Sequence, residues 1–241
     1  MGCQLLRDQS GRPAARQGSV LQRKEPKVIR KGVLQMGVRQ DESGWTHVDW
    51  HLDGVTPRMI DWFWSNMEKG FALWHPIEHT DFYWHSRPTG NQFLGKIHVA
   101  PQVWSDGKVF RPHIRFDDVA TLPEDVKEIV VYDHVVAAVG ISLFGENVKD
   151  DDPPIAYRIH QWEGTDGGVR GISSAIPAQA EPLETERGLV WAKHCAEEVG
   201  YWQDFLPELY RLWRVVKNPG VNPFFSLKVV REGKSLRYAE K

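Results

Sequence analysis

The amino-acid sequence predicts an α+β domain in which one curved antiparallel sheet wraps around a long C-terminal helix and leaves an internal cavity, a helix-grip arrangement. Three observations predict it. The middle of the chain holds several short alternating stretches separated by Pro, Gly and Asp clusters, which is typical of a meandering antiparallel sheet. A strand pair and a helix come before these stretches, and one long helical pattern follows them. No repeat or linker interrupts residues 32–241, so we expect a single domain there.

The first predicted elements are two strands and a helix. Residues 33–38 and 45–52 alternate between apolar and polar positions in strand fashion. Thr56 followed by Pro57 is typical of a helix start, because Pro is favoured at the first helical position. The helix is expected to end before Gly70.

The sheet and the terminal helix come next. Six further strands are expected, at residues 79–85, 93–103, 108–116, 128–143, 155–162 and 168–177. The last long element is a helix from about residue 184 to 217, stopped by Asn218-Pro219-Gly220. It would span about 51 Å at 1.5 Å per residue, enough to cross a whole sheet, and Pro207 should kink it.

Charge is distributed unevenly along the chain. The whole protein carries a net charge of −2, but residues 1–31 hold eight basic residues against two acidic ones, without aromatic residues. We interpret residues 1–31 as a mobile basic arm. The rest of the chain lacks a basic stripe with interleaved aromatics, so no nucleic-acid partner is expected. No stretch is apolar enough for a membrane span or a secretory leader, which predicts a cytoplasmic protein without a membrane partner.

The long helix carries a polar pair on its inward face. At about 100° per residue, His194 and Glu198 fall in the same sector as Trp191, Phe205 and Leu212. A buried carboxylate is costly unless it is paired or bound to a metal. Three explanations for Glu198 stay open on this evidence: a hydrogen-bonded His–Glu pair, a partly hydrated cavity, or a metal site with further ligands from elsewhere.

A second histidine-rich segment, residues 74–85, bears on that choice. A strand over 79–85 would place His79, Asp81, Tyr83 and His85 on one face. If this face lines the cavity, His79 joins His194 and Glu198 in a set of two histidines and one carboxylate. That is the composition of a catalytic zinc centre with an open position for water.

Three separated motifs resemble a known family. They are Asp53-Gly-Val-Thr-Pro57 with the following Met59–Trp64, the segment Phe71–His79, and His194-x-x-x-Glu198. Together, over about residues 33–216, they resemble the diacetylphloroglucinol hydrolase and phloretin hydrolase family. The resemblance implies a Bet v 1/START-like helix-grip fold with a zinc ion, or another divalent metal, in the cavity. It also implies that His79, His194 and Glu198 are the metal ligands.

The activity implied by this resemblance is hydrolysis of the carbon–carbon bond between an acyl group and a phenolic ring, through metal-activated water. The substrate would be a phenolic ketone such as an acylphloroglucinol, a phloretin-like compound or a hydroxyaryl ketone. Two positions depart from the family pattern. A further glutamate ligand expected on residues 95–103 has no counterpart, the nearest positions being Pro101 and Gln102, and an aromatic hydroxyl is replaced by Phe71.

Hydrolysis at an aryl carbon also needs a group that transfers a proton near neutral pH, for which histidine is the usual choice. His134, within the apolar stretch 130–136, and His75 are the candidate catalytic residues. The alternatives are a hydrogen-bonded core histidine at His134 and a turn residue before Pro76 at His75.

Two other functions fit the same residues. One is a non-catalytic helix-grip binder of aromatic ligands whose metal site has decayed, and the other is a metal-free polyketide cyclase or aromatase. The sequence holds eleven tryptophans, and in each of the three functions several of them would form the walls of a pocket for a flat guest. A homodimer is compatible with any of them.

Overall fold

The computed structural model describes residues 36–145, 147–178 and 185–239. The expected basic arm at residues 1–31 lies outside the described residues. Within them, no helix is long and apolar enough to cross a membrane.

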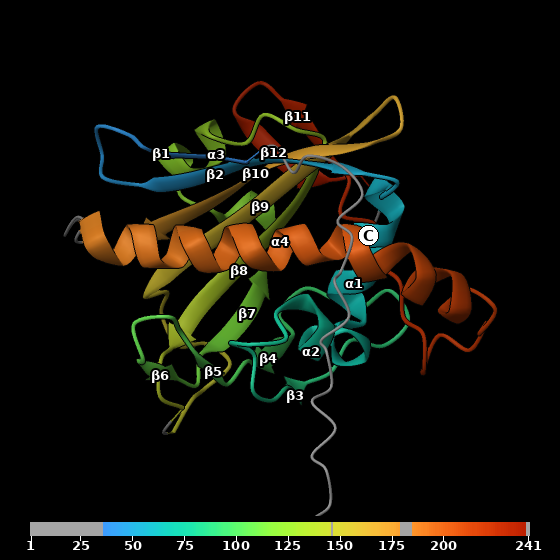
Figure 1. Cartoon of the computed structure of the whole chain (residues 1–241). Helices are drawn as coiled ribbons and strands as arrows, with labels where there is room; N and C mark the ends of the chain where they lie inside the picture. Colours follow the sequence, from blue (N-terminus) through green and yellow to red (C-terminus); the bar gives the residue numbers. More distant parts are fainter. Residues whose placement is uncertain (1–35, 146, 179–184, 240–241) are drawn as a thin grey trace, which may run out of the picture. The chain divides into compact units, whose positions relative to one another are not determined.

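The described chain is built on one eight-stranded antiparallel sheet (Figure 1). In spatial order its strands are β1 (Met36–Gln40), β2 (Thr46–Asp53), β10 (Gly168–Pro177), β9 (Ala156–Thr165), β8 (His134–Ser142), β7 (His113–Asp117), β4 (Ile97–Val99) and β3 (Tyr83–Ser86). Sequential strands from β7 to β10 are neighbours, which confirms the predicted meander.

Helix α4 (Thr185–Trp213) lies across this sheet, as Figure 1 shows. It packs against β2 and β10 and also against α1 (Pro57–Ser65) and α2 (Phe71–Trp74). The predicted long helix is therefore confirmed, four residues shorter at its C-terminal end. Pro207 lies inside it without ending it, and the ribbon bends in its C-terminal part. Leu212, beyond the bend, is 60% exposed instead of inward, because the last turns run past the sheet.

Several predicted strand boundaries are wrong. Residues 128–143 do not form one strand, because α3 (Glu124–Glu128) follows Pro123 and β8 starts only at His134. Residues 93–103 are divided at Pro101, which has no N–H for a ladder, into β4 and β5 (Gln102–Val103), the latter paired with β6 (Val109–Phe110).

A C-terminal hairpin, β11 (Val229–Glu232) and β12 (Ser235–Tyr238), was not predicted. Two short 3₁₀ helices, Met67–Lys69 and Val119–Thr121, complete the elements.

The expected strand over 79–85 is also wrong in its first half, where regular pairing begins only at Tyr83. Asp81, Tyr83 and His85 are exposed, and only His79 of the predicted polar face is buried. The bend at Pro76 lets His79 turn inward while the following residues run along the surface.

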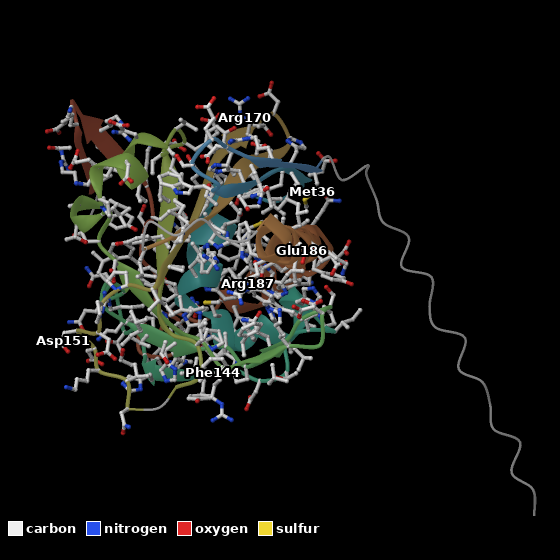
Figure 2. All side chains as sticks on the ribbon, turned by 90° about the vertical axis from the view of Figure 1, so that its left-hand side faces the viewer. Met36, Phe144, Asp151, Arg170, Glu186 and Arg187 are labelled. Carbon is white, nitrogen blue, oxygen red and sulfur yellow. The ribbon has the colours of Figure 1, made fainter. Side chains whose placement is uncertain are left out.

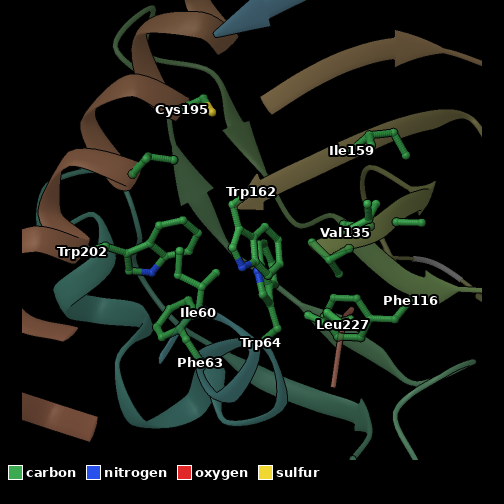
Figure 3. Close-up of a cluster of buried hydrophobic side chains, with 14 of the residues drawn as sticks. Ile60, Phe63, Trp64, Phe116, Val135, Ile159, Trp162, Cys195, Trp202 and Leu227 are labelled. Atoms are coloured by element: carbon green, nitrogen blue, oxygen red, sulfur yellow. The ribbon is translucent and has the colours of Figure 1, made fainter. Parts of the chain in front are cut away.

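The hydrophobic core fills the space between α1, α4 and the sheet (Figure 3). Its largest fully buried side chains include Trp62, Trp64, Trp162, Trp202 and Phe63. The Phe63 ring meets the Trp202 ring edge to face at 5.5 Å, an arrangement that aromatic rings favour.

Gly70 fixes how closely α2 approaches α4. A Cβ atom at this position would lie 2.9 Å from Leu209 Cδ2 and 3.0 Å from ring carbons of Phe205 and Phe63. Only glycine leaves this room, so α2 and the turn after it are held directly against the terminal helix.

Candidate metal centre and ligand cavity

Helix α2 and the turn after it carry His79 to the inner face of α4. The Trp74 ring stacks on Trp202 of α4, with centroids 5.2 Å apart and planes at 14°. Residues 78–80 then pair with residues 101–103: the Val103 N–H donates to the Glu78 carbonyl at 2.9 Å, and the Thr80 N–H donates to the Pro101 carbonyl at 3.0 Å. This short ladder sets His79 opposite Gln102.

His194 and Glu198 come from α4, one turn apart on its inward face, as the helical phase predicts. Glu198 Oε2 lies 3.4 Å from His194 Nε2 and 3.6 Å from His79 Nε2. All three side chains are buried. The structure therefore brings together the three residues that the sequence predicts as metal ligands, from two segments more than 100 residues apart.

Each histidine of this triad has its other ring nitrogen occupied. His79 Nδ1–H donates to the Phe71 carbonyl at 3.0 Å, and the His79 ring stacks on the Phe71 ring at 3.9 Å. His194 Nδ1–H donates to the Glu78 carboxylate at 2.6 Å. These hydrogen bonds orient the rings so that both Nε2 atoms face Glu198, which is how histidine ligands are oriented at metal sites.

The triad matches the requirements of a zinc ion. Zinc–nitrogen and zinc–oxygen bonds of about 2.0–2.2 Å in a tetrahedron separate neighbouring ligand atoms by about 3.3 Å. The 3.4 and 3.6 Å separations seen here are close to that value and long for good hydrogen bonds. Imidazole and carboxylate are both ligands that zinc accepts, so the residues present fit the ion that the family resemblance implies.

Burial and neighbouring charges shift the pKa values of His79 and His194 in opposite directions. Burial, with His194 nearby, holds the pKa of His79 well below its ordinary value, so its ring is neutral, the form that binds metal. Burial also acts to lower the pKa of His194, but the Glu198 and Glu78 carboxylates outweigh it and raise that pKa. Protons therefore compete with a metal ion more strongly at His194 than at His79.

A second cluster, His75, Glu78 and His194, lies behind the first. Both nitrogens of His75 are occupied: Nδ1 accepts from the Glu78 backbone N–H at 3.1 Å, and Nε2–H donates to Glu197 at 3.2 Å. Its ring stacks on His194 at 4.8 Å. We interpret this cluster as the hydrogen-bonded support of His194, because His75 keeps no lone pair for a metal.

Gln102 occupies the position next to the triad where the resemblance implies a fourth ligand. Because it is directly opposite His79 in the ladder, its side chain lies on the same face. Its amide oxygen accepts from Trp104 Nε1 at 2.5 Å, and its amide nitrogen donates to the Ala100 carbonyl at 3.2 Å. The position of the implied fourth ligand is therefore occupied by a neutral amide, which Trp104 and the Ala100 carbonyl hold by hydrogen bonds.

A cavity that is open to solvent adjoins the triad. Its walls are mainly apolar and aromatic, with side chains from α2, α4 and the inner face of the sheet. The aromatic walls are Trp64, Phe71, Trp74, Trp104, Phe110 and Trp191; the polar ones, besides the triad, are His98, Gln102, Arg158 and His160. An apolar cavity with a few convergent polar groups is the usual form of a small-molecule site.

The two predicted proton-transfer histidines do not line this cavity. His75 lies behind His194, as described above. His134 Nδ1 bonds to Asp61 at 2.9 Å and its ring stacks on Trp162, away from the triad. His98 and His160 line the cavity instead. Burial lowers the pKa of each to about 3, so both rings are neutral.

Sequence reasoning did not single out His160, His98, Arg158 or Glu78. The sequence does carry a usable signal for His160 and Arg158. They stand two residues apart on β9 and so share one face of a strand. Glu78 directly precedes His79, but nothing local to the sequence indicates that it bonds His194, which is 116 residues away.

The fold and the site together define an α+β helix-grip domain with a buried His/Glu triad at one wall of an aromatic cavity. No family model and no curated protein matches the chain. Among solved structures it is similar to protein Ms6760 from Mycobacterium smegmatis, with a TM-score of 0.51 at 13% identity over 73% of this chain and 99% of that one.

Two further solved structures are similar at lower scores. They are Ara h 8.0201, with a TM-score of 0.45 at 14% identity over 71% of this chain and 99% of that one, and the human StarD13 lipid transfer and protein localization domain, with a TM-score of 0.40 at 12% identity over 72% and 84%. Likeness at these identities concerns the fold alone. The chain has the α+β helix-grip fold that the sequence predicts and the resemblance implies.

Proposed function

We propose that the protein is a metal-dependent hydrolase that binds zinc through His79, His194 and Glu198 and cleaves the carbon–carbon bond between an acyl group and a phenolic ring. One observation carries the proposal: two Nε2 atoms and one carboxylate oxygen converge at 3.4 and 3.6 Å, and each Nδ1 atom is already hydrogen-bonded. The ligand orientation is thus built into the fold before any metal binds.

The reaction adds one water molecule across the acyl–aryl bond: the acyl carbon gains the hydroxyl and leaves as a carboxylic acid, and the ring carbon gains the hydrogen. A bound zinc ion supplies Lewis acidity, which activates water at neutral pH and polarises a carbonyl. A hydroxyl ortho or para to the acyl group lets the ring take a ketone form, which makes carbon a tolerable leaving group.

The chain's own residues hold and orient the guest. The Trp64, Trp74 and Trp191 rings supply flat apolar walls that exclude bulk water from the ring. His160 Nδ1 lies 2.8 Å from Ser173 Oγ. If the Ser173 hydroxyl donates to it, His160 Nε2–H is left to donate to a phenolic oxygen of the guest. In this proposal His160 takes the role for which the sequence suggested His134 or His75.

Elemental analysis of purified protein tests the metal centre. We expect one zinc ion per chain in the wild type and none in His194→Ala or Glu198→Ala. The matched control is His51→Ala, because the His51 side chain is partly exposed on β2 and, among the described residues, pairs with Asp53 outside the triad. Circular dichroism shows whether each variant is folded.

The reaction is tested by mass spectrometry of products from acylphloroglucinols, phloretin-like dihydrochalcones and hydroxyacetophenones. Hydrolysis yields two fragments whose masses sum to that of the substrate plus water. Metal-free folded protein that binds a phenolic guest unchanged would instead make the chain a binder, which the neutral Gln102 in the fourth-ligand place favours. A product of unchanged mass would make it a cyclase.

A further inference from the structure

Arg158 stands apart from the other basic side chains near the cavity. It lies on β9 and, among the described residues that line the cavity, it alone carries a lysine or arginine charge. Its guanidinium lies over the Trp191 ring at 5.3 Å, and Nη1–H donates to the Tyr157 carbonyl at 3.1 Å. No carboxylate of a described residue lies within ion-pair distance of it.

Arg115 on β7 has the carboxylate partner that Arg158 lacks among the described residues. Arg115 is held by Asp117 through two charge-assisted hydrogen bonds. Arg158 has one neutral carbonyl and an aromatic face, and burial lowers its pKa to about 10, with Cys195 and Glu198 opposing that change only in part. It therefore stays charged at neutral pH, half-buried at the wall of an apolar cavity and without a carboxylate partner among the described residues.

The position of Arg158 relative to the triad defines where an anion would sit. Trp191, on which the guanidinium lies, precedes His194 by three residues on the same face of α4. This is about 4.5 Å along the helix axis. The cation and the metal ligands thus border one cavity, so a single aromatic guest with two substituents can contact both.

We propose that Arg158 binds a carboxylate of the guest, so that the substrate class is an acyl-hydroxybenzoate: a phenolic ketone whose ring also carries a carboxylate. Apart from the one Nη1 hydrogen bonded to Tyr157, the guanidinium donors make no hydrogen bond to a described residue and are free for the fork-shaped pairing that arginine makes with carboxylates. The ketone in this assignment rests on the proposed hydrolase function, whereas the carboxylate rests on Arg158 alone.

Isothermal titration calorimetry with matched probes tests the assignment. The probes are 3-acetyl- and 5-acetyl-2-hydroxybenzoate, in which the acyl group is ortho or para to the hydroxyl, each paired with its methyl ester, which removes the charge and keeps the ring. For the tighter isomer we expect the wild type to bind the acid at least about tenfold more tightly than the ester. Arg158→Gln should bind acid and ester equally, and Arg158→Lys should keep part of the preference.

Arg170→Gln is the matched control, because Arg170 lies exposed on the neighbouring strand β10 (Figure 2) and pairs with Glu163. It should keep the wild-type preference. Equal binding of acid and ester by the wild type, no binding of either acid at millimolar concentration, or a preference that persists in folded Arg158→Gln would overturn the assignment. The wild-type ratio needs no variant, so a variant that fails to fold leaves the test intact.

The two proposals fail in distinguishable ways. If the protein binds the acid through Arg158 but never releases a carboxylic acid fragment with zinc present, the hydrolase function is wrong and the anion site stands. If it cleaves neutral hydroxyaryl ketones and shows no preference for the acid, the hydrolase stands and the carboxylate assignment is wrong.

Discussion

The inward face of α4 contributes to two regions that differ in polarity and in what they contact. Toward its C-terminal half, Trp202 and Leu206 are fully buried in the closed core, where apolar contacts are the only requirement (Figure 3). One to two turns earlier, His194 and Glu198 are almost as buried but face the triad and the cavity. One helix face thus holds both a stabilising region and a chemical one, so substitutions in each should affect different measurements.

The most direct way to separate the two regions is to remove a large side chain from the closed core. Trp162 on β9 is fully buried and does not line the cavity. We expect Trp162→Ala to lower the free energy of unfolding by about 3–5 kcal/mol, measured by urea denaturation, because it leaves a large cavity. Zinc bound per folded chain should not change.

Trp162→Phe provides the control for this substitution. It keeps an aromatic ring and should recover most of the lost stability. A loss of zinc from Trp162→Ala that stays folded would show that the two regions are not separable.

The reverse experiment changes the support of the metal ligands. Glu78 accepts the His194 Nδ1 hydrogen bond at 2.6 Å and does not itself belong to the triad. Glu78→Gln should weaken zinc binding by about 10–100-fold, the usual cost of losing such a partner, with a small change in unfolding free energy. Competition with a chelating dye measures the affinity.

Glu208→Gln is the matched control for Glu78→Gln. Glu208 pairs with Arg211 on an exposed part of α4, outside the triad and the cluster that supports it. It should leave zinc affinity within about twofold, as expected for an exposed pair. Equal effects of the two substitutions would remove Glu78 from its positioning role.

The same contrast explains what could be predicted from the sequence. Helical phase alone placed His194 and Glu198 inward, because a 29-residue helix keeps its phase from end to end. Phase failed at Leu212, where the helix has passed the edge of the sheet and the inward face no longer has a partner. Periodicity says which face a residue takes, and tertiary structure decides whether that face is covered.

The remaining site residues depend on pairings between distant strands. His160 and Arg158 border the cavity because β9 lies between β8 and β10, and the order of strands cannot be read from alternation. His134 has a similar local pattern on β8 but is bonded to Asp61 of α1. Candidate histidines on strands are therefore distinguished only once the sheet order is known.

Acid should destabilise the protein through the buried histidines of the cavity. The pKa of His98 is lowered from 6.5 to about 3 by burial, with a small contribution from His113. Between these pH values the unfolded chain binds a proton at this position and the folded chain does not. Stability is therefore lost as the pH falls below about 6.5, by up to about 1.4 kcal/mol per pH unit for one group.

Urea denaturation between pH 7 and pH 4 measures this slope. His98→Gln removes the titrating group and should flatten the slope by up to one proton, whereas the same change at the partly exposed His51 should not alter it. The closed core has no such group among Trp202, Leu206 and Trp162. An unchanged slope in His98→Gln would mean that His98 is protonated in the folded protein.

The finest test of the chemical region restores the acidic residue that the resemblance implies. Gln102 is opposite His79, and its amide is held by Trp104 and the Ala100 carbonyl. Gln102→Glu adds a second carboxylate to the cavity wall that holds Glu198, which is unfavourable without a metal and favourable with one. We expect zinc affinity to rise by about tenfold, or about 1.4 kcal/mol, while the metal-free protein melts at a lower temperature.

A higher zinc affinity together with a lower melting temperature of the metal-free protein would identify residue 102 as the position of a fourth metal ligand. Thermal unfolding with and without zinc should show a larger zinc-induced increase in melting temperature for Gln102→Glu than for wild type, because metal binding to the native state stabilises it. The exposed Gln92, changed to Glu, should show no such increase. If Gln102→Glu lowers stability equally with and without zinc, its side chain does not reach the ion, and the centre is limited to its three protein ligands.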